Sequence, residues 1–429
     1  MRRIRWFEPD DPSTPVEWPA VAAILATLFL NFSFWLGVAD RFYMAWPLPT
    51  YVALAAVVVM STTAIAVVGP WLASSGEKSL FRLVEDSLGA FPSHIIRWIC
   101  VGFAAFWLAA AVSLPVRVWL YFRHEPSWHE YFWTYLLVGF LCLTGLQSLR
   151  TEARLALFTS KLAVALLVAA LWRVHDGWPA IPGGFEHMWG EPTAPRLWSG
   201  LAELSAYVVP FGLLAADLSA RLRTRKDAVL AATAGIAIPL FGSVLLAGIV
   251  AVATAKSQFY QPSLNPTVSM ALFGHVASSA LPGRWAIGAI TIFGVARFCI
   301  RSLSISVPVQ PVRWKWAVVG LVCAVSCWLS LHPFAVWFEA TMRGLANCLG
   351  AVSAILTADW LVRHRAASRR IDWTALAAFA IGIVVPWLLP HQWWEPRVLP
   401  CYGVAFAACV AGRWGTRAVI FASTGICGH

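Results

Sequence analysis

Three charged side chains, Lys161, Glu203 and Arg297, each lie within a run of mainly apolar residues. A charge inside a hydrophobic segment is costly, so residues of this kind usually bind a ligand or transfer protons. Lys161 lies about seven residues from the nearer end of its run, which argues against a lysine that only snorkels to an interface. Glu203 could be an interfacial carboxylate, a desolvated group that titrates near neutral pH, or a partner of Arg297 or Lys161.

Other reactive residue types lack the spacing that their chemistry needs. The nine cysteines show no CxxC or Cys/His ligand pattern, and most stand in apolar segments. His124, His129, His175 and His187 are scattered, and the chain has no Gly-rich phosphate loop and no nucleophile elbow. We therefore expect no enzyme, no metal site and no cofactor.

The composition is that of a membrane protein. Hydrophobic residues make up 59% of the chain and charged residues 12%, and the mean hydropathy is +0.68. A soluble fold could not bury so much apolar surface, so we expect the lipid bilayer as a partner. The net charge of +11 belongs to short segments between apolar runs, without a basic stripe interleaved with aromatics, so we expect no nucleic-acid partner.

The apolar runs are long enough for helices that cross about 30 Å of hydrocarbon. We expect residues 1–18 and 422–429 to be tails around one transmembrane domain, 19–421, and polar Glu8 to Thr14 to separate the basic start from a first span that is not cleaved. The predicted spans are 19–39, 51–73, 95–117, 131–149, 154–173, 198–219, 228–254, 284–306, 314–331, 335–361, 373–390 and 399–421.

Lysine and arginine are distributed unevenly over the segments between these spans. Most of the 32 basic residues fall on the set of alternate segments that includes both termini. Because basic residues are enriched in cytoplasmic loops, we expect both termini in the cytoplasm of a multi-pass protein of the inner or plasma membrane.

Three segments resemble the purine-cytosine permease group of nucleobase cation symporters, which have the leucine-transporter fold. They are Gly212 to Ala228, which carries an Ala-Asp before a basic exit; Ser353 to Arg365 with Ile371 to Gly382, which carry Ala-Asp-Trp and Asp-Trp-Thr-Ala-Leu; and Gly76 to Gly89, similar to the loop after the second helix. Asp217 and Asp359 lie at cytoplasmic helix ends beside arginines, where we expect them to anchor the structure.

The resemblance implies an all-α fold of two inverted five-helix repeats, about 19–173 and 198–361, followed by helices 373–390 and 399–421. In this fold the substrate binds where the first and sixth helices are broken. The candidate breaks are Asn31 to Gly37, which includes Ser33, and Tyr207 to Gly212, in which Pro210 could instead produce only a kink.

In the resembled family, aromatic residues of the third and sixth helices hold a planar base between them. The matching positions here are Phe103, with Trp107 one turn away, and Tyr207 or Phe211. Relatives have tryptophan where this chain has Phe103, and a small or polar residue in place of Trp107, so the resemblance predicts a reshaped pocket. Arg297 falls near a position that contacts substrate in relatives.

The resemblance also bears on ion coupling. Lys161 is similar to a lysine that occupies the sodium site in sodium-independent amino acid permeases, and the segment Thr291 to Arg301 lacks the pair of adjacent hydroxyls that completes that site. The fixed cation Arg297 would also repel sodium. We therefore expect protons, rather than sodium, as the coupling ion, with Lys161 and Glu203 as coupling residues.

The sequence thus predicts a secondary transporter for a nucleobase or a related small nitrogenous solute. Two alternatives stay open at this point. The chain could be an amino acid or amine permease of the same superfamily, which Lys161 favours, although Asn31 to Gly37 contains one glycine only. It could also be a membrane sensor that binds a small molecule without transporting it.

Overall fold

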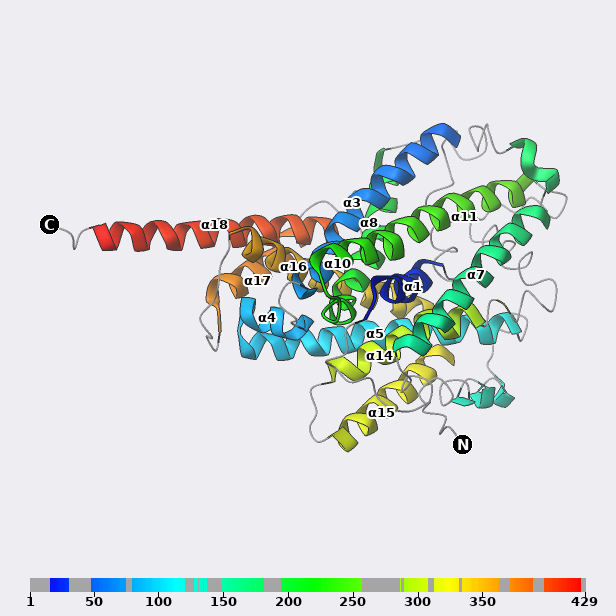
Figure 1. Cartoon of the computed structure of the whole chain (residues 1–429), viewed down its shortest axis with the longest axis horizontal. Helices are drawn as coiled ribbons and strands as arrows, with labels where there is room; N and C mark the ends of the chain where they lie inside the picture. The colour runs from blue at the N-terminus through cyan, green and yellow to red at the C-terminus, as the bar shows by residue number, and fades with distance from the viewer. Residues whose placement is uncertain are drawn as a thin grey trace.

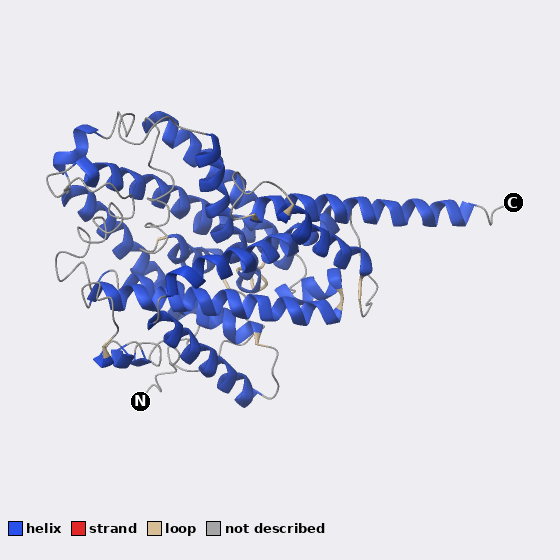
Figure 2. Cartoon of the chain, turned by 180° about the vertical axis from the view of Figure 1, so that it is seen from behind, coloured by secondary structure: helices blue, strands red, loops and turns tan. Residues whose placement is uncertain are grey.

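The regular structure of the computed structural model is helical throughout the part of the chain that it describes (Figure 2). This part comprises residues 16–30, 48–74, 79–119, 127–129, 131–133, 135–136, 149–173, 175–180, 194–256, 286, 289–307, 312–331, 334–362, 371–388 and 397–425. The predicted all-α class is confirmed.

The described helices reproduce the predicted spans. They are α1 (Trp18–Phe29), α3 (Leu48–Ser74), α4 (Leu80–Leu88), α5 (Ala90–Trp119), α7 (Leu149–Arg173), α8 (Ala194–Leu214), α9 (Ala216–Ser219), α10 (Arg225–Ala232), α11 (Ile238–Lys256), α14 (Arg297–Ser306), α15 (Val312–Leu331), α16 (Phe334–Leu361), α17 (Trp373–Trp387) and α18 (Val398–Gly425). Seven of the described helical segments are long and apolar enough to cross a membrane, and four shorter apolar helices accompany them. Every predicted span has such a helix except 131–149, most of which lies outside the described residues.

One helix was expected as a loop. Within Gly76 to Gly89, α4 begins after Ser79, whose side chain accepts a hydrogen bond from the Arg82 backbone N–H, and it ends at Gly89. Leu80, Phe81, Val84 and Leu88 are buried on one side of it. This spacing gives an amphipathic helix, which the framing glycines and its short length concealed in the sequence.

Close packing between α3 and α8 depends on a small residue. A Cβ atom on Gly212 would lie 2.4 Å from the Cβ of Ala66, so any larger residue would force the two helices apart. Small residues commonly allow close helix approach in membrane proteins, where packing rather than water exclusion drives association.

Helix α1 lies against two π-helical turns. These are η2 (Thr233–Ala237), between α10 and α11, and η3 (Ile292–Ala296), directly before α14. Such turns interrupt an α-helix at an energetic cost and are frequent at functional sites. The surroundings of α1 are therefore a candidate functional site.

The last three helices form a group at one end of the molecule. Figure 1 shows α18 passing α16 and α17 and then continuing beyond the other helices. Trp360, Trp373 and Trp414, on these three helices, are 45%, 71% and 65% exposed. These tryptophans directly follow Asp359, Asp372 and Arg413, which form one ion-pair cluster. They therefore lie at one level, as expected of an aromatic belt at a membrane interface.

Candidate functional site

Helix α1 stops inside the protein. Its twelve residues extend over about 18 Å, which is well short of a bilayer's hydrocarbon thickness. The hydroxyl of Tyr207 on α8 donates a hydrogen bond of 2.6 Å to the carbonyl of Leu28, and Ser243 on α11 donates one of 2.6 Å to the carbonyl of Phe29. These bonds satisfy the carbonyls that a buried helix end leaves exposed. The predicted break, with Asn31 and Ser33, follows directly but lies outside the described residues.

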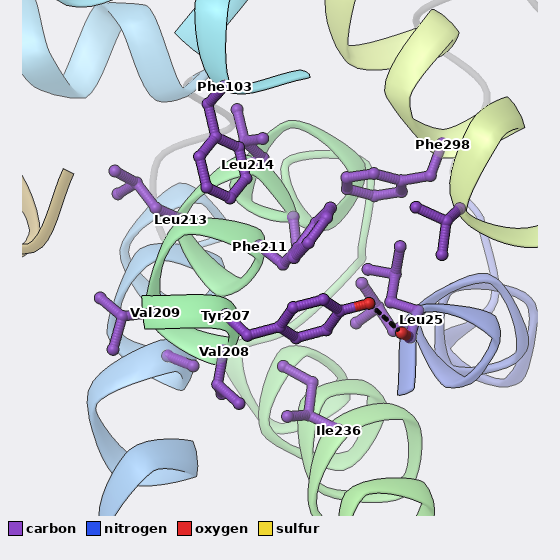
Figure 3. Close-up of a cluster of buried hydrophobic side chains, with 14 of the residues drawn as sticks. Leu25, Phe103, Tyr207, Val208, Val209, Phe211, Leu213, Leu214, Ile236 and Phe298 are labelled. Carbon is purple, nitrogen blue, oxygen red and sulfur yellow. Dashed lines mark hydrogen bonds between the residues drawn. The ribbon is translucent and has the colours of Figure 1, made fainter. Parts of the chain in front are cut away.

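Aromatic residues of α5 and α8 meet beside this helix end (Figure 3). The ring centroids are 4.5 Å apart between Trp107 and Tyr207, 5.5 Å between Trp107 and Phe211, and 5.3 Å between Phe103 and Phe211. The structure therefore brings together all four aromatic residues that we expected from the third and sixth helices. We call these four residues the aromatic cluster.

The rings of the aromatic cluster cover one another in this conformation. Trp107 and Tyr207 meet edge to face, with an angle of 87° between the ring planes. A planar ligand stacked between two rings needs about 7 Å between their planes, because each stacked contact takes about 3.5 Å. Trp107 is the partly exposed member, while the other three are buried. The rings must therefore separate before a planar solute can enter.

The prediction of a break at Tyr207 to Gly212 is wrong. Helix α8 is continuous through this segment, and the interruption comes later, at Ala215 between α8 and α9. Pro210 is accommodated inside the helix, and the glycine at 212 serves the close approach to Ala66 instead of unwinding the backbone.

Arg297 is the first residue of α14 and is 1% exposed. The ring of the next residue, Phe298, packs on Phe211 of the aromatic cluster, with 5.7 Å between the ring centroids. One turn further along α14, Arg301 forms an ion pair with Glu152 of α7. The side chain of Glu152 is 5% exposed and that of Arg301 is 15% exposed. Sequence reasoning missed Glu152, because it stands at the edge of an apolar run and its partner is far away in the chain.

Lys161 does not join this group. Helix α7 packs on α1, and its buried residues include Ala156, Thr159 and Ala163. Lys161 shares the opposite, exposed side of α7 with Phe158 and other apolar residues. The expectation that Lys161 occupies an interior cation site is therefore not met. The backbone of Glu203 lies in α8, but its side chain is outside the described part.

The segments that carry the family resemblance come together around α4. Asp217 on α9 accepts a hydrogen bond of 2.8 Å from the backbone N–H of Leu80, at the start of α4. At the other end of α4, Arg413 of α18 lies 3.0 Å from Asp359 of α16 and 2.6 Å from Asp372, the residue that precedes α17. Asp217 and Asp359 thus form the contacts between segments that an anchoring role requires.

Within the described ranges, no group of three or more His, Cys, Asp or Glu residues could hold a metal ion. What the site offers is a set of aromatic faces, a helix end with backbone carbonyls and a buried guanidinium. These groups can bind a small planar solute by stacking and hydrogen bonding, and none of them is arranged as a nucleophile with an adjacent base.

The sequence matches no protein-family model and no curated protein sequence. The folded chain is similar to solved structures over almost its whole length. An inward-facing structure of Mhp1 matches with a TM-score of 0.70 and 15% identity, over 97% of this chain and 96% of that one. A sodium-coupled sialic acid symporter matches with a TM-score of 0.62 and 11% identity, over 96% and 92%.

The chain has the leucine-transporter fold. The structure of MhsT in complex with L-phenylalanine agrees, with a TM-score of 0.61 and 12% identity over 93% of this chain and 98% of that one. A second structure of Mhp1, a nucleobase-cation-symport-1 family transporter in a closed conformation with bromovinylhydantoin bound, matches with a TM-score of 0.68, at 15% identity over 96% of each chain. This fold, together with seven described helical segments that are long and apolar enough to cross a membrane, indicates an integral membrane protein with several spans.

Proposed function

We propose that this protein is a secondary transporter that moves a nucleobase or a related small nitrogenous solute by alternating access. The observation that carries the proposal is the end of α1, held at Leu28 by Tyr207, beside the aromatic cluster. A helix that stops within the membrane offers backbone groups to a ligand, and the aromatic faces suit a flat ring.

The solute class follows from the residue types of the site. Stacking supplies affinity for any flat ring, and a buried guanidinium such as Arg297 favours a solute with carbonyl oxygens or an acidic N–H. Nucleobases and hydantoins carry such groups. The similarity to a transporter with bromovinylhydantoin bound supports this choice.

We propose protons as the coupling ion, because the fixed positive charge of Arg297 would repel sodium. The exposed position of Lys161 removes it from this argument. Glu203 on α8 stays the proposed coupling carboxylate, and both termini are proposed to lie in the cytoplasm of the inner or plasma membrane.

An amino acid permease is the second candidate function, and one observation favours it: the fold is shared with MhsT, whose structure holds L-phenylalanine. An α-amino acid would need its carboxylate and its ammonium bound at helix ends. Because α8 is continuous, the end of α1 alone would have to bind both groups. This continuity makes the amino acid permease the weaker candidate. A sensor that binds without transport would show ligand affinity but no uptake.

Uptake into proteoliposomes tests the proposal. Radiolabelled nucleobases, hydantoins and amino acids are supplied under separately imposed proton and sodium gradients. We expect uptake of a base or hydantoin that is stimulated by the proton gradient and indifferent to sodium. Uptake of amino acids alone would favour the permease, sodium-driven uptake would contradict proton coupling, and binding without uptake would favour the sensor.

A further inference from the structure

Helix α4 joins parts of the protein that are far apart in the chain. It follows α3 and leads directly into α5, and it packs on α5, α16 and α17. Figure 1 shows it beside α17 at the end of the molecule where α18 leaves the other helices. Its two ends are held in different ways.

The end of α4 that leads into α5 is held by many contacts. Arg413 donates to Asp372 at 2.6 Å, to both oxygens of Asp359, and to the carbonyl of Ser87 at 3.4 Å. The backbone N–H of Asp372 donates to the carbonyl of Leu88 at 3.0 Å. Because Arg413 and Asp372 are nearly fully buried and bonded to each other, separating them would leave charges unpaired in the interior.

The start of α4 is held differently. The contact that reaches it from α9 is the hydrogen bond from the Leu80 N–H to Asp217, on the same helical turn that Ser79 caps. Leu80 and Phe81 are also buried at this end, and Arg97 stacks on the Phe81 ring, but a hydrogen bond to one carboxylate breaks at a lower cost than the buried ion pairs of Arg413. Gly89, with a φ of 97°, supplies a bend between α4 and α5 about which the start of α4 can move.

Asp217 is also linked to the candidate site. It lies six residues beyond Phe211, across the short interruption at Ala215 that separates α8 from α9. Phe211 contacts both Trp107 and Phe103, so we infer that opening of the aromatic cluster to admit a solute shifts Phe211 and the end of α8. The carboxylate of Asp217 then moves relative to Leu80, whereas the Arg413 end of α4 stays joined through Gly89 to α5, which carries Phe103 and Trp107.

We propose that Asp217 is a positioning residue for transport. The start of α4 docks on Asp217 in the state described here and is released when α8 and α9 shift, while the Arg413 cluster keeps the other end of α4 in place. The released helix uncovers the adjoining end of α5. The link to transport rests on the proposed function, whereas the docking itself does not.

The chain contains its own reporter for this movement. Cys100 of α5 is fully buried, one turn beyond Arg97, and lies within electrostatic reach of Asp217. The guanidinium of Arg97 stacks on the ring of Phe81 in α4, at 4.7 Å from its centroid. Release of α4 should therefore expose Cys100. Cys299 of α14 is equally buried and serves as the internal control.

The test measures the rate at which a thiol-reactive maleimide modifies Cys100 and Cys299 in the full chain, read by mass spectrometry. Asp217→Ala removes the acceptor and should speed the modification of Cys100 about tenfold, because loss of a helix-capping bond weakens the docked end by about that factor. Asp217→Asn keeps an accepting oxygen, so its rate of Cys100 modification should stay within about threefold of the rate in the unmodified protein. Asp227→Ala, which changes the same residue type in the first turn of α10, should alter neither cysteine.

Two results would overturn the docking. An unchanged rate of Cys100 modification in Asp217→Ala would show that the bond does not hold α4. An equal increase in the rate of Cys299 modification would show that the substitution loosens the whole protein. In uptake assays, Asp217→Ala should change the maximal rate by at least about threefold and leave KM within about twofold, because Asp217 is not part of the binding site. An unchanged maximal rate would refute the positioning role, whereas absence of uptake in the unmodified protein would refute the proposed function and leave the cysteine result standing.

Discussion

The hydroxyl of Tyr207 donates a hydrogen bond of 2.6 Å to the carbonyl of Leu28, and the same ring meets Trp107 edge to face. One side chain thus closes the end of α1 and covers the aromatic cluster. Phe29 also packs on the Tyr207 ring, at 5.8 Å between centroids. Opening of the aromatic cluster and rearrangement at the end of α1 are therefore coupled through one residue.

Tyr207→Phe should leave the Leu28 carbonyl without its side-chain donor. We expect a loss of about 1 kcal/mol in stability, in the range measured for single hydrogen bonds within membrane proteins, and weaker solute binding. Thermal unfolding in detergent measures the first effect, and uptake measures the second. Tyr402→Phe is the matched control, because its hydroxyl bonds to Thr357 between α18 and α16 and should affect stability alone. Equal effects of both variants on uptake would contradict the role of Tyr207.

Removal of one aromatic face should weaken solute binding and also lower stability, because Trp107 packs on Tyr207 and Phe211. Trp107 is partly exposed, so we expect Trp107→Ala to raise KM about tenfold, since a stacked ring contributes about 1 kcal/mol or more. Phe406→Ala on α18 is the control, because that ring stacks on Tyr402 away from the site. An unchanged KM in Trp107→Ala would place the solute elsewhere.

The pair of Glu152 and Arg301 should behave as a buried ion pair. Glu152→Gln alone leaves Arg301 without this charged partner and should lower the free energy of unfolding by about 3 kcal/mol or more. The double variant with Arg301→Gln should recover part of this loss. A double-mutant cycle by thermal unfolding measures the coupling. The exposed pair of Arg82 and Glu85 on α4 is the control and should show little coupling.

Gly89→Ala should destabilise the bend after α4. The φ of 97° is unfavourable for a residue with a Cβ atom, so the substitution should lower the free energy of unfolding by about 1 kcal/mol or more. Gly242→Ala in α11 meets no atom within 4 Å and should be neutral or slightly stabilising, because alanine favours helix. A difference in melting temperature between the two variants measures the strain, and equal effects would contradict it.

Lys161→Ala separates the sequence-based expectation from the structure. An exposed side chain on the outer side of α7 should be dispensable, so we expect uptake within about twofold of the unmodified protein. Arg297→Gln, which alters a buried cation next to Phe298 in the chain, should lower uptake strongly. Loss of uptake in Lys161→Ala would restore the predicted coupling role.

Much of the fold could be predicted because spans are encoded locally. Hydropathy over about 20 residues identifies a membrane helix whatever its neighbours, and eleven helices lie where such runs were found. The aromatic candidates Phe103, Trp107, Tyr207 and Phe211 also came from sequence, through the resemblance, and the structure brings them together.

The orientation of single side chains could not be predicted in the same way. The run around Lys161 is apolar on nearly every side, so its sequence contains no periodic signal for the face that meets α1. Glu152 and Arg301 are 149 residues apart, and Arg413 is 326 residues from Ser87. Contacts of this kind depend on how helices pack, which local patterns do not specify.

The sequence by itself thus determined a membrane protein, the positions of its helices and the residue types available to a site. Only the tertiary structure decided that α8 continues through Pro210, that Lys161 lies outside, and that Asp217 and Arg413 hold the two ends of α4. The physical reason is that burial in a bilayer depends on the composition of each segment, whereas the pairing of buried polar groups depends on which segments become neighbours.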